Sequence, residues 1–363
     1  MKKIRKPNNT DFKLNQFLNE AKIPRNREVN VEFIDTGSAM LNMAFSGDVN
    51  AGLPRARVIN FVGDGSSGKT IIALSCAFNF LKTIDIIPSR IFPKVKKKKV
   101  IYNNGEAVMD FPIKKMFGEK FEKLVDWKRS KYIESAGKDF IKQAFSLKKG
   151  ESLLYIIDSW DSFRSIHQTT IEDNQDDENA KAYDFPKQKY AWKFFAEVCD
   201  VIEDNKIDAT LIIISQTKSK IGVKFGKKKY RTGGDALNFY THLVPWLRVV
   251  KKHEKTKFGE KRVYAIDCEA SVERTKVGLP FRKANFRILL DYGIDDITSM
   301  GQYLRSHKIN EFRGIPLKDL HKFAVEIEKR DYHQRLRDKV FKVWNKVENG
   351  FQEEINQRSP NRL

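Results

Sequence analysis

The sequence of 363 residues has no long apolar run, and no stretch approaches the roughly 18 residues of a membrane-spanning helix. Cysteine is also rare: Cys76, Cys199 and Cys268 are scattered and show no metal-ligand spacing. The basic start, MKKIRKPNNTDFKL, is not followed by an apolar segment, which argues against a secretory signal. These absences argue against a membrane protein and favour a reducing, cytoplasmic location.

Acidic residues are outnumbered, with 47 Asp and Glu against 68 Lys and Arg, and the formal net charge is +21. Hydrophobic residues make up 40% of the chain and aromatic residues 12%, so a large core can form. An excess of positive charge indicates the kind of partner rather than the fold. Nucleic acid is therefore the first candidate partner, and an anionic membrane surface, which no other feature supports, is the second.

The shortage of acid is most marked between Gln216 and Gly234, where the sequence has seven cations and no acidic residue. An apolar, strand-like run, TLIIIS, leads directly into this stretch, and Ile221 and Phe225 interrupt its charge. The pattern favours a basic loop that binds an anionic partner, although a solvated loop without a partner would have the same composition. The cations are Lys218, Lys220, Lys224, Lys227, Lys228, Lys229 and Arg231.

Strand-like and helix-like segments alternate from about residue 31 to residue 295. Four apolar runs are typical of buried parallel strands: ARVINFVG, KVIYNN, SLLYIID and ATLIIIS. Segments of helical length, such as TIIALSCAFNFLK, separate some of them, and later strand-like runs suggest an antiparallel extension. We predict an α/β fold with a mostly parallel central sheet covered on both faces, followed by a charged helical region.

The segment FVGDGSSGKT fits a phosphate-binding loop between a buried strand and a helix. Glycines allow backbone N–H groups to converge on phosphate oxygens, and the following helix directs its positive end at the same anion. Lys69 would reach the terminal phosphates, and the Thr70 hydroxyl would bind Mg²⁺. The predicted nucleotide-binding residues of this loop are Gly63, Asp64, Gly65, Ser66, Ser67, Gly68, Lys69 and Thr70.

Three polar residues at the ends of other strand-like runs could complete a site that hydrolyses ATP. Asp158 ends LLYIID and could hold Mg²⁺ through water. Glu106 could polarise the attacking water, and Gln216 could sense the γ-phosphate. Taken singly, each could equally be an ordinary strand-end or loop residue. In a parallel sheet, however, these strand ends share the edge at which ligands bind.

At these motifs the sequence resembles the RecA recombinases, including their phage-encoded relatives, over about residues 36–295. The resemblance is carried by GLPRARVINFVGDGSSGKT, NNGEAVMD, IIDSWDSF, ISQTKSKIGVKFG with TGGDALNFY, and VERTKVGLPFRKANF. It implies a RecA-like P-loop ATPase core at 35–298, an N-terminal oligomerisation segment at 1–34 and a small basic helical domain at 299–363. It also implies ATP and Mg²⁺ as cofactors.

The resemblance assigns roles to single residues. It implies that Glu106 is the catalytic base and that Asp110 contacts adenine. Arg274 and Lys276 match the two basic residues that reach the ATP of a neighbouring subunit. ATP would then lie between subunits, and a head-to-tail interface that does not close produces a helical filament. A basic strand edge that prevents aggregation would have the same composition.

The basic loop matches the family's second DNA-binding loop, including Gly233 and Gly234, which let the backbone approach phosphates. Its cations would contact the phosphates of single-stranded DNA, while Ile221 and Phe225 could insert between bases. Because Gln216 begins this segment, nucleotide state and DNA binding would be coupled in both directions.

Four departures from the family limit the transfer. The chain between Lys69 and Glu106 is longer and includes IPSRIFPKVKKKK, either an exposed basic hairpin or an extra DNA contact. Asn-Asn-Gly precedes Glu106 where the family commonly has Asp-Ala before the glutamate, which could alter the hydrolysis rate. The first DNA loop, expected near 164–186, is acidic, so no DNA contact is transferred there. The final INQRSPNRL replaces an acidic tail, which favours a viral or specialised version.

We therefore expect a DNA-dependent ATPase that forms a helical filament on single-stranded DNA and exchanges strands with a homologous duplex. Two alternatives stay open: a ring-forming ATPase that translocates DNA, and a DNA-coating or mediator protein that does not hydrolyse ATP. The long basic loop, Arg274 and Lys276 argue against the ring. The departures beside Glu106 leave the protein without hydrolysis open.

Overall fold

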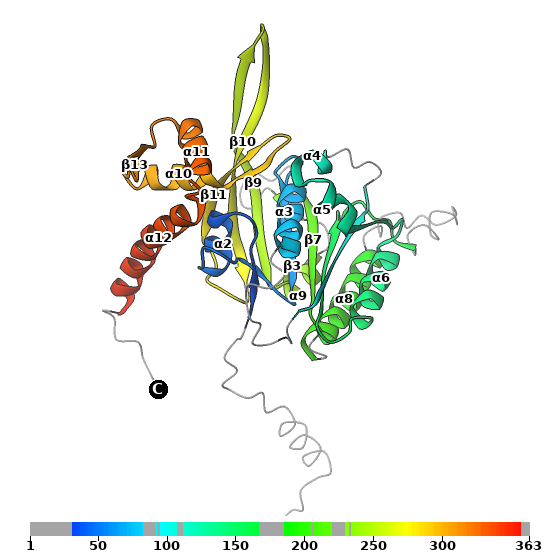
Figure 1. Cartoon of the computed structure of the whole chain (residues 1–363). Coiled ribbons are helices and arrows are strands. Elements are labelled where there is room, and N and C mark those ends of the chain that lie inside the picture. Colours follow the sequence, from blue (N-terminus) through cyan, green and yellow to red (C-terminus); the bar gives the residue numbers. More distant parts are fainter. Residues whose placement is uncertain are drawn as a thin grey trace, which may run out of the picture. The chain divides into compact units, whose positions relative to one another are not determined.

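A large sheet forms the centre of the fold (Figure 1). The computed structural model describes residues 31–82, 92, 95–106, 112–166, 185–204, 207–219, 229–231 and 234–356. Within this part of the chain the sheet has ten strands, nine of them in the order β12-β11-β10-β9-β3-β7-β6-β4-β5, while β8 pairs with β7. Their bounds are β3 Val58–Gly63, β4 Lys97–Asn104, β5 Val125–Arg129, β6 Glu151–Asp158, β7 Ala209–Ser219, β8 Lys229–Arg231, β9 Leu243–Lys257, β10 Glu260–Thr275, β11 Lys283–Leu289 and β12 Gly293–Asp295.

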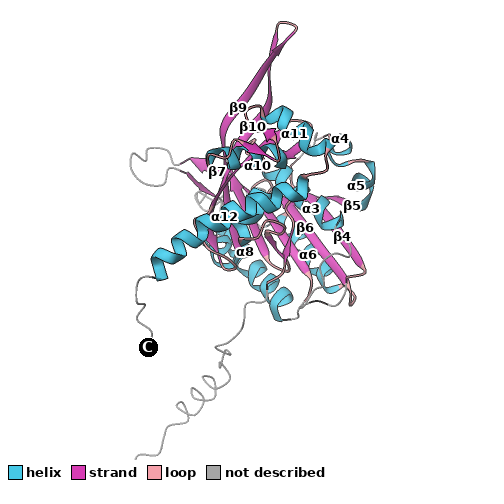
Figure 2. Ribbon diagram, turned by 60° about the vertical axis from the view of Figure 1, so that its left-hand side comes forward, coloured by secondary structure: helices cyan, strands magenta, loops and turns pink. Residues whose placement is uncertain are grey.

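Six neighbouring strands, from β9 through β3, β7, β6 and β4 to β5, run parallel to one another. On the other side of β9 the strands β10, β11 and β12 are antiparallel to their neighbours. The distal parts of β9 and β10 extend beyond the rest of the sheet as a two-stranded ribbon (Figures 1 and 2). The predicted α/β class, with a parallel set of buried strands and an antiparallel extension, is confirmed.

Hydrophobic side chains project from both faces of the parallel strands, as the continuous apolar run of β6 shows. Leu154 and Ile156 join the buried cluster that contains the helices α2 (Ala39–Ser46) and α3 (Lys69–Lys82). Their strand neighbours Leu153, Tyr155 and Ile157 join a second cluster with α6 (Ile133–Phe145), α8 (Phe185–Cys199) and α9 (Gly234–Tyr240). Successive residues of a strand point to opposite faces, so a run that is apolar throughout requires cover on both sides.

Short elements connect these layers, and helices follow the last strand. The helices after β12 are α10 (Asp296–Ser306), α11 (Leu320–Lys329) and α12 (His333–Asn356), and no helix of the described chain is long and apolar enough to span a membrane. The connecting elements are β1 Phe33–Ile34, β2 Leu53–Pro54, α4 Ile113–Phe117, α5 Glu119–Leu124, the π-helical turn η2 Asp200–Asp204, β13 Glu311–Phe312 and β14 Ile315–Pro316.

The C-terminal helices share a core with the sheet. Met300 of α10, Phe323 of α11 and Val340 of α12 belong to the same buried cluster as α2 and α3. The described residues from Glu32 onward also form one compact unit. The separate domain predicted for 299–363 stays a prediction, and the segment predicted at 1–34 lies almost entirely outside the described residues.

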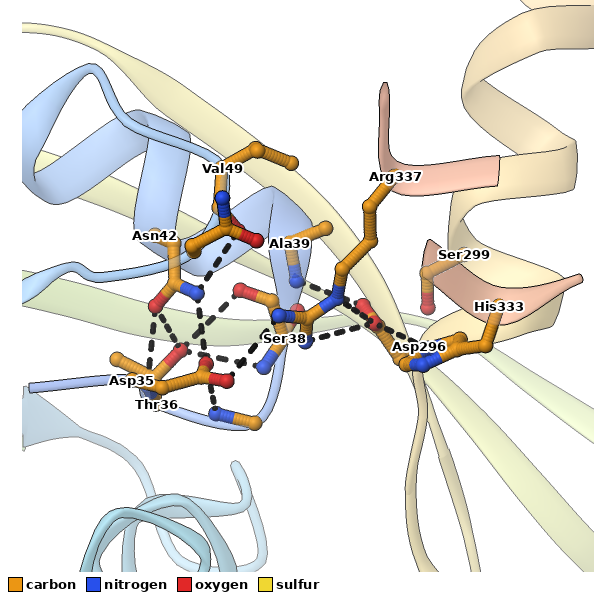
Figure 3. A network of polar contacts seen from close by, with 12 residues as sticks. Asp35, Thr36, Ser38, Ala39, Asn42, Val49, Asp296, Ser299, His333 and Arg337 are labelled. Carbon is orange, nitrogen blue, oxygen red and sulfur yellow. Dashed lines mark hydrogen bonds and ion pairs between the residues drawn. The ribbon is translucent and has the colours of Figure 1, made fainter. Parts of the chain in front are cut away.

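A buried ion network joins α12 to the start of α2 (Figure 3). Arg337 lies 3.1 Å from a carboxylate oxygen of Asp35 and 3.1 Å from one of Asp296. The other oxygen of Asp296 accepts a hydrogen bond from the backbone N–H of Ala39 at 2.7 Å. Burial favours the protonated form of Asp296, but the hydrogen bond from His333 and the charge of Arg337 outweigh it and lower the pKa of Asp296.

Replacing Arg337 with methionine is expected to cost about 3–5 kcal/mol in the free energy of unfolding, because it leaves buried carboxylates without a partner. Urea unfolding followed by circular dichroism measures the change. Lys339→Met, at an exposed position of the same helix, is the control and should change stability by less than about 0.5 kcal/mol. An equal, small effect of both substitutions would contradict the structural role given to Arg337.

Candidate functional site

Parallel pairing brings the polar strand ends to one edge of the sheet. Gly63 at the end of β3 pairs with Gln216 of β7, and Asn104 at the end of β4 pairs with Asp158 of β6. Glu106 follows two residues after Asn104. The four strands are consecutive in the sheet, so the phosphate-binding loop and the three predicted polar residues lie on neighbouring strands, as the sequence suggested.

The phosphate-binding loop needs glycine at two positions for steric reasons. A Cβ atom on Gly63 would lie 2.5 Å from the carbonyl oxygen of Leu247, a backbone atom that cannot yield easily. Gly68 has a φ of +87°, and a Cβ atom there would lie 2.4 Å from Cδ1 of Ile288. Gly65 faces open space, so nothing nearby requires its lack of a side chain. The loop therefore lies close to the adjacent strand β9 and to the side chain of Ile288 on β11.

Lys69, the first residue of α3, is buried and bends back onto the loop. Its Nζ donates hydrogen bonds to the carbonyl oxygens of Gly63 at 3.0 Å and Asp64 at 2.6 Å. Burial lowers the pKa of Lys69, although the charge of Asp158 partly offsets this effect. A phosphate oxygen could replace these neutral carbonyls and would place a negatively charged acceptor in direct contact with the ammonium group.

Thr70 and Asp158 form the part of the site that suits a magnesium ion. The Thr70 hydroxyl donates a hydrogen bond to Oδ2 of Asp158 at 2.6 Å, and the Tyr102 hydroxyl donates to the same oxygen. Burial raises the pKa of Asp158, while these two hydrogen bonds act in the opposite direction. One hydroxyl and one carboxylate fit Mg²⁺, which takes few protein oxygens and completes its shell with phosphate and water.

Glu106 and Gln216 are in direct contact. Nε2 of Gln216 donates a hydrogen bond to Oε1 of Glu106 at 3.0 Å. The hydroxyl groups of Ser159 and Ser162 lie 3.4 and 3.5 Å from the same oxygen. The structure therefore joins the predicted base to the predicted γ-phosphate sensor, and the turn after β6 supports the base.

The first residues of the basic loop are held by two further carboxylates. The backbone N–H of Gln216 donates to Oδ2 of Asp161 at 2.6 Å, and the hydroxyl of Thr217 donates to Oδ1 of Asp64. Burial raises the pKa of Asp161. β7 then continues to Ser219, and β8 returns antiparallel to it. The described ends of the loop thus form a short two-stranded ribbon.

Arg231 differs from the other cations of the loop because its side chain is buried, with 8% of its surface exposed. The guanidinium donates hydrogen bonds to Oδ1 of Asn60 on β3 and to Oδ1 of Asn238 on α9. Burial and, to a lesser extent, the charge of Arg274 lower the pKa of Arg231 to about 10. Arg231 is thus placed as an internal strut, and the prediction that it contacts DNA phosphates does not fit its burial.

Arg274 and Lys276 lie at the end of β10 with exposed side chains. Nζ of Lys276 lies 5.7 Å from the centre of the Phe239 ring on α9. Among the described residues, neither side chain makes a hydrogen bond or ion pair with Lys69, Asp158 or Glu106. Their predicted role toward the ATP of a neighbouring subunit stays a prediction.

Much of the predicted DNA-binding loop falls outside the described residues. Lys218 is described and exposed, while for Lys229 and Gly234 the backbone alone is described. The predicted residues that lie outside are Asp110, Lys220, Ile221, Lys224, Phe225, Lys227, Lys228 and Gly233. Most of the basic insertion at 85–99 and the whole acidic segment at 172–178 lie outside as well.

Sequence reasoning missed Tyr102, Asp161 and Thr217. Tyr102 and Tyr155 both occupy buried strands, yet Tyr102 donates to Asp158 and Tyr155 donates to Asp139. Two asparagines follow Tyr102 at the end of β4, whereas Tyr155 lies within an apolar run, but neither pattern identifies the partner of the hydroxyl. Asp161 could have been noticed, because it lies three residues after Asp158 in IIDSWDSF, and Thr217 because it directly follows Gln216.

This chain is similar in sequence to known proteins over much of its length. The family model described as the RecA N-terminal domain matches residues 193–295. Protein RecA of Mycoplasma pneumoniae is 27% identical over 266 residues, which cover 73% of this chain and 69% of the relative. Protein RecA of Gloeobacter violaceus is 27% identical over 280 residues (76% and 66%), and that of Fusobacterium nucleatum is 26% identical over 283 residues (76% and 65%). The match thus spans about two thirds of each relative. The phage origin suggested by the sequence stays a prediction.

Replacing Tyr102 with phenylalanine should shift the pH dependence of Mg²⁺-dependent ATP binding. If Asp158 holds Mg²⁺, the ion needs the ionised carboxylate, whose pKa is already raised by burial, so binding should fall as the pH drops towards that pKa. Without the Tyr102 hydroxyl the pKa rises further, and the loss should begin at a higher pH. Calorimetric titration between about pH 5 and 8 measures the midpoint, against an ordinary aspartate pKa of about 3.9.

Tyr155→Phe is the matched control for this measurement, because Tyr155 is also buried in a strand but donates to Asp139 instead. Its midpoint should equal that of the unmodified protein. If Tyr102→Phe also left the midpoint unchanged, the Tyr102 hydroxyl would have no influence on the charge of Asp158.

Proposed function

We propose that this chain, which is similar to RecA proteins over about three quarters of its length, is an ATP-dependent recombination protein of that family. It assembles as a helical filament on single-stranded DNA, pairs that strand with a homologous duplex and exchanges the strands. ATP binding stabilises the extended filament, and hydrolysis to ADP and phosphate releases the DNA.

One observation carries this proposal: the hydrogen bond of 3.0 Å between Nε2 of Gln216 and Oε1 of Glu106. Glu106 is the carboxylate that would take a proton from the attacking water. Gln216 belongs to β7, the strand whose continuation is the basic loop. A group for hydrolysis and a segment for DNA binding are thereby joined through one side-chain contact, which supports a reciprocal coupling between ATP and DNA.

The nucleotide would occupy the loop from Gly63 to Thr70. Lys69 would exchange its two carbonyl contacts for phosphate oxygens, and Thr70 and Asp158 would hold Mg²⁺. The ion would neutralise negative charge on the phosphates when it is bound. Asp110 is proposed to contact the adenine ring, by resemblance to the family.

Exposure of Arg274 and Lys276 supports a site shared between subunits. Each subunit would supply these two cations to the ATP of one neighbouring subunit. Its own ATP would be contacted by the Arg274 and Lys276 of the subunit on its other side. Repetition of one such heterologous contact produces an open helix rather than a closed dimer. The segment at 1–34 is proposed to strengthen the same contact, and the helices after 299 are assigned no DNA-binding residue.

The DNA strand is proposed to lie along the basic loop. Lys218, Lys220, Lys224 and Lys227–Lys229 would contact phosphates, with Ile221 and Phe225 between bases and Gly233 and Gly234 allowing close approach of the backbone. Arg231 is left out of this set because its side chain is buried. Neutralisation of several phosphates makes binding strongly dependent on salt.

Replacing Glu106 with glutamine should lower the rate of phosphate release by about 100-fold or more, the usual contribution of a general base. Filament formation with a slowly hydrolysed ATP analogue and single-stranded DNA should persist, which electron microscopy shows directly. Glu122→Gln, an exposed glutamate on α5, is the control and should release phosphate at the unmodified rate. Release should also be faster in the presence of DNA.

Other outcomes of that experiment point to other functions. Closed rings instead of helical filaments would indicate a translocating ATPase. Coated DNA without phosphate release, unchanged by Glu106→Gln, would indicate a coating or mediator protein and would contradict the role given to Glu106.

Replacing Lys227, Lys228 and Lys229 together with alanine should weaken binding to single-stranded DNA and leave ATP affinity without DNA nearly unchanged. Each lost phosphate contact reduces the slope of log affinity against log salt by about 0.7, so the slope should fall by about 2. Fluorescence anisotropy at several salt concentrations measures both quantities. The charge-matched control replaces the exposed Lys339, Lys342 and Lys346 of α12. Equal effects of the two triple substitutions would defeat the assignment of the loop.

A further inference from the structure

We infer that Thr217 and Asp64 form a second connection between the phosphate-binding loop and the DNA-binding loop, separate from the contact of Gln216 with Glu106. Thr217 acts as a positioning residue: it touches neither nucleotide nor DNA in this assignment, but sets the position of the strand that leads to the DNA. This inference rests on the proposed function, because it concerns how ATP changes DNA binding.

The two residues meet where their strands stop pairing. The last parallel pair of β3 and β7 joins Gly63 to Gln216, and Asp64 and Thr217 are the residues that follow. The Thr217 hydroxyl donates a hydrogen bond to Oδ1 of Asp64, so a side-chain contact continues the connection after the backbone ladder ends. Thr217 is also the first residue of β7 that pairs with β8, opposite Arg231. Thr217 therefore lies in the first residue pair of the β7–β8 ribbon, from which the basic loop extends.

On the nucleotide side, Asp64 is held by the lysine that binds phosphate. Its carbonyl oxygen accepts hydrogen bonds from Nζ of Lys69 at 2.6 Å and from the hydroxyl of Ser67 at 2.8 Å. When Lys69 turns to a phosphate, the carbonyl of Asp64 loses that donor. The negatively charged carboxylate of Asp64 would then lie in the loop that binds the phosphate, and the two negative charges would repel each other. Both effects favour movement of Asp64, and Thr217 is bonded to it.

Other contacts near this first pair of the β7–β8 ribbon are made with residues outside the phosphate-binding loop. Asp161, in the turn after β6, accepts from the backbone N–H of Gln216 at 2.6 Å. The buried Arg231 fixes β8 to Asn60 in the interior of β3 and to Asn238 on α9. One strand of the ribbon is thus anchored to the core, while Thr217 on the other strand is attached to the loop that responds to phosphate. A shift of Asp64 would therefore change the angle of the ribbon.

The test compares Thr217→Val with Thr217→Ser. Valine keeps the shape and the strand preference of threonine but has no hydroxyl, whereas serine keeps the hydroxyl. For each variant the affinity for a fluorescent oligo(dT) is measured by anisotropy with a non-hydrolysable ATP analogue and without nucleotide. The ratio of the two affinities is the coupling. We expect Thr217→Val to reduce this ratio by about tenfold, because hydrogen bonds to charged groups are among the stronger ones, while Thr217→Ser keeps it.

Two further variants separate the hydrogen bond from the charge of Asp64. Asp64→Asn retains an oxygen that can accept from Thr217 but removes the charge, and Asp64→Ala removes both. If the hydrogen bond carries the coupling, Asp64→Ala should reduce the ratio as Thr217→Val does, and the double variant should show no further loss. Asp64→Ala also provides the test if the valine variant does not fold.

The outcomes distinguish failure of this inference from failure of the proposed function. A coupling ratio of Thr217→Val equal to that of the unmodified protein would overturn the inference and leave the proposed function standing. Loss of ATP affinity by Thr217→Val in the absence of DNA would also overturn it, because Thr217 would then serve the nucleotide site itself. If the unmodified protein bound oligo(dT) equally with and without nucleotide, both proposals would fail.

Discussion

The in-register parallel pairing of β3, β7, β6 and β4 is the constraint on which the site depends. Each strand contributes one polar group or turn at its carboxyl end, and pairing places these ends side by side. The alternation of Leu153 and Leu154 between two buried clusters specifies the register, because a slip of one residue would turn every side chain to the opposite face. The apolar core therefore positions polar groups of the candidate site that lie at the strand ends.

Buried charges are arranged in two different ways in this molecule. Arg337 and Asp296 are paired within the chain, and the pair connects α12 to α10, while the N–H of Ala39 bonds the same carboxylate from α2. Lys69 and Asp158 are buried too, but their hydrogen bonds come from neutral partners such as carbonyl and hydroxyl groups. Burial lowers the pKa of Lys69 and raises that of Asp158, so both charged forms would gain from ions that bind from outside. In the first arrangement the buried charges neutralise each other within the chain. In the second, the buried charges are suited to binding phosphate and Mg²⁺.

The two strands that begin and end the basic loop are held by different kinds of contact: one to the protein core and one to the candidate nucleotide site. Arg231 is buried against β3 and α9, which gives the returning strand a fixed position. Gln216 and Thr217, on the outgoing strand, contact Glu106 and the phosphate-binding loop instead. These two sets of contacts are the basis for the proposal that the nucleotide site influences the orientation of β7 and β8, since coupling between distant ligands requires an element that both can bias.

Local patterns in the sequence were sufficient for the fold class, for the loop from Gly63 to Thr70, and for the placing of Asp158 and Glu106 at strand ends, because apolar runs, glycine spacing and strand length are properties of neighbouring residues. The sequence grouped Arg231 with the exposed cations, since charge composition does not report burial. It also did not distinguish Tyr102 from Tyr155. Those differences, and the contact of Thr217 with Asp64, depend on which residues far apart in the chain become neighbours, and the pairing of the strands together with the packing of the sheet against its helices decides that.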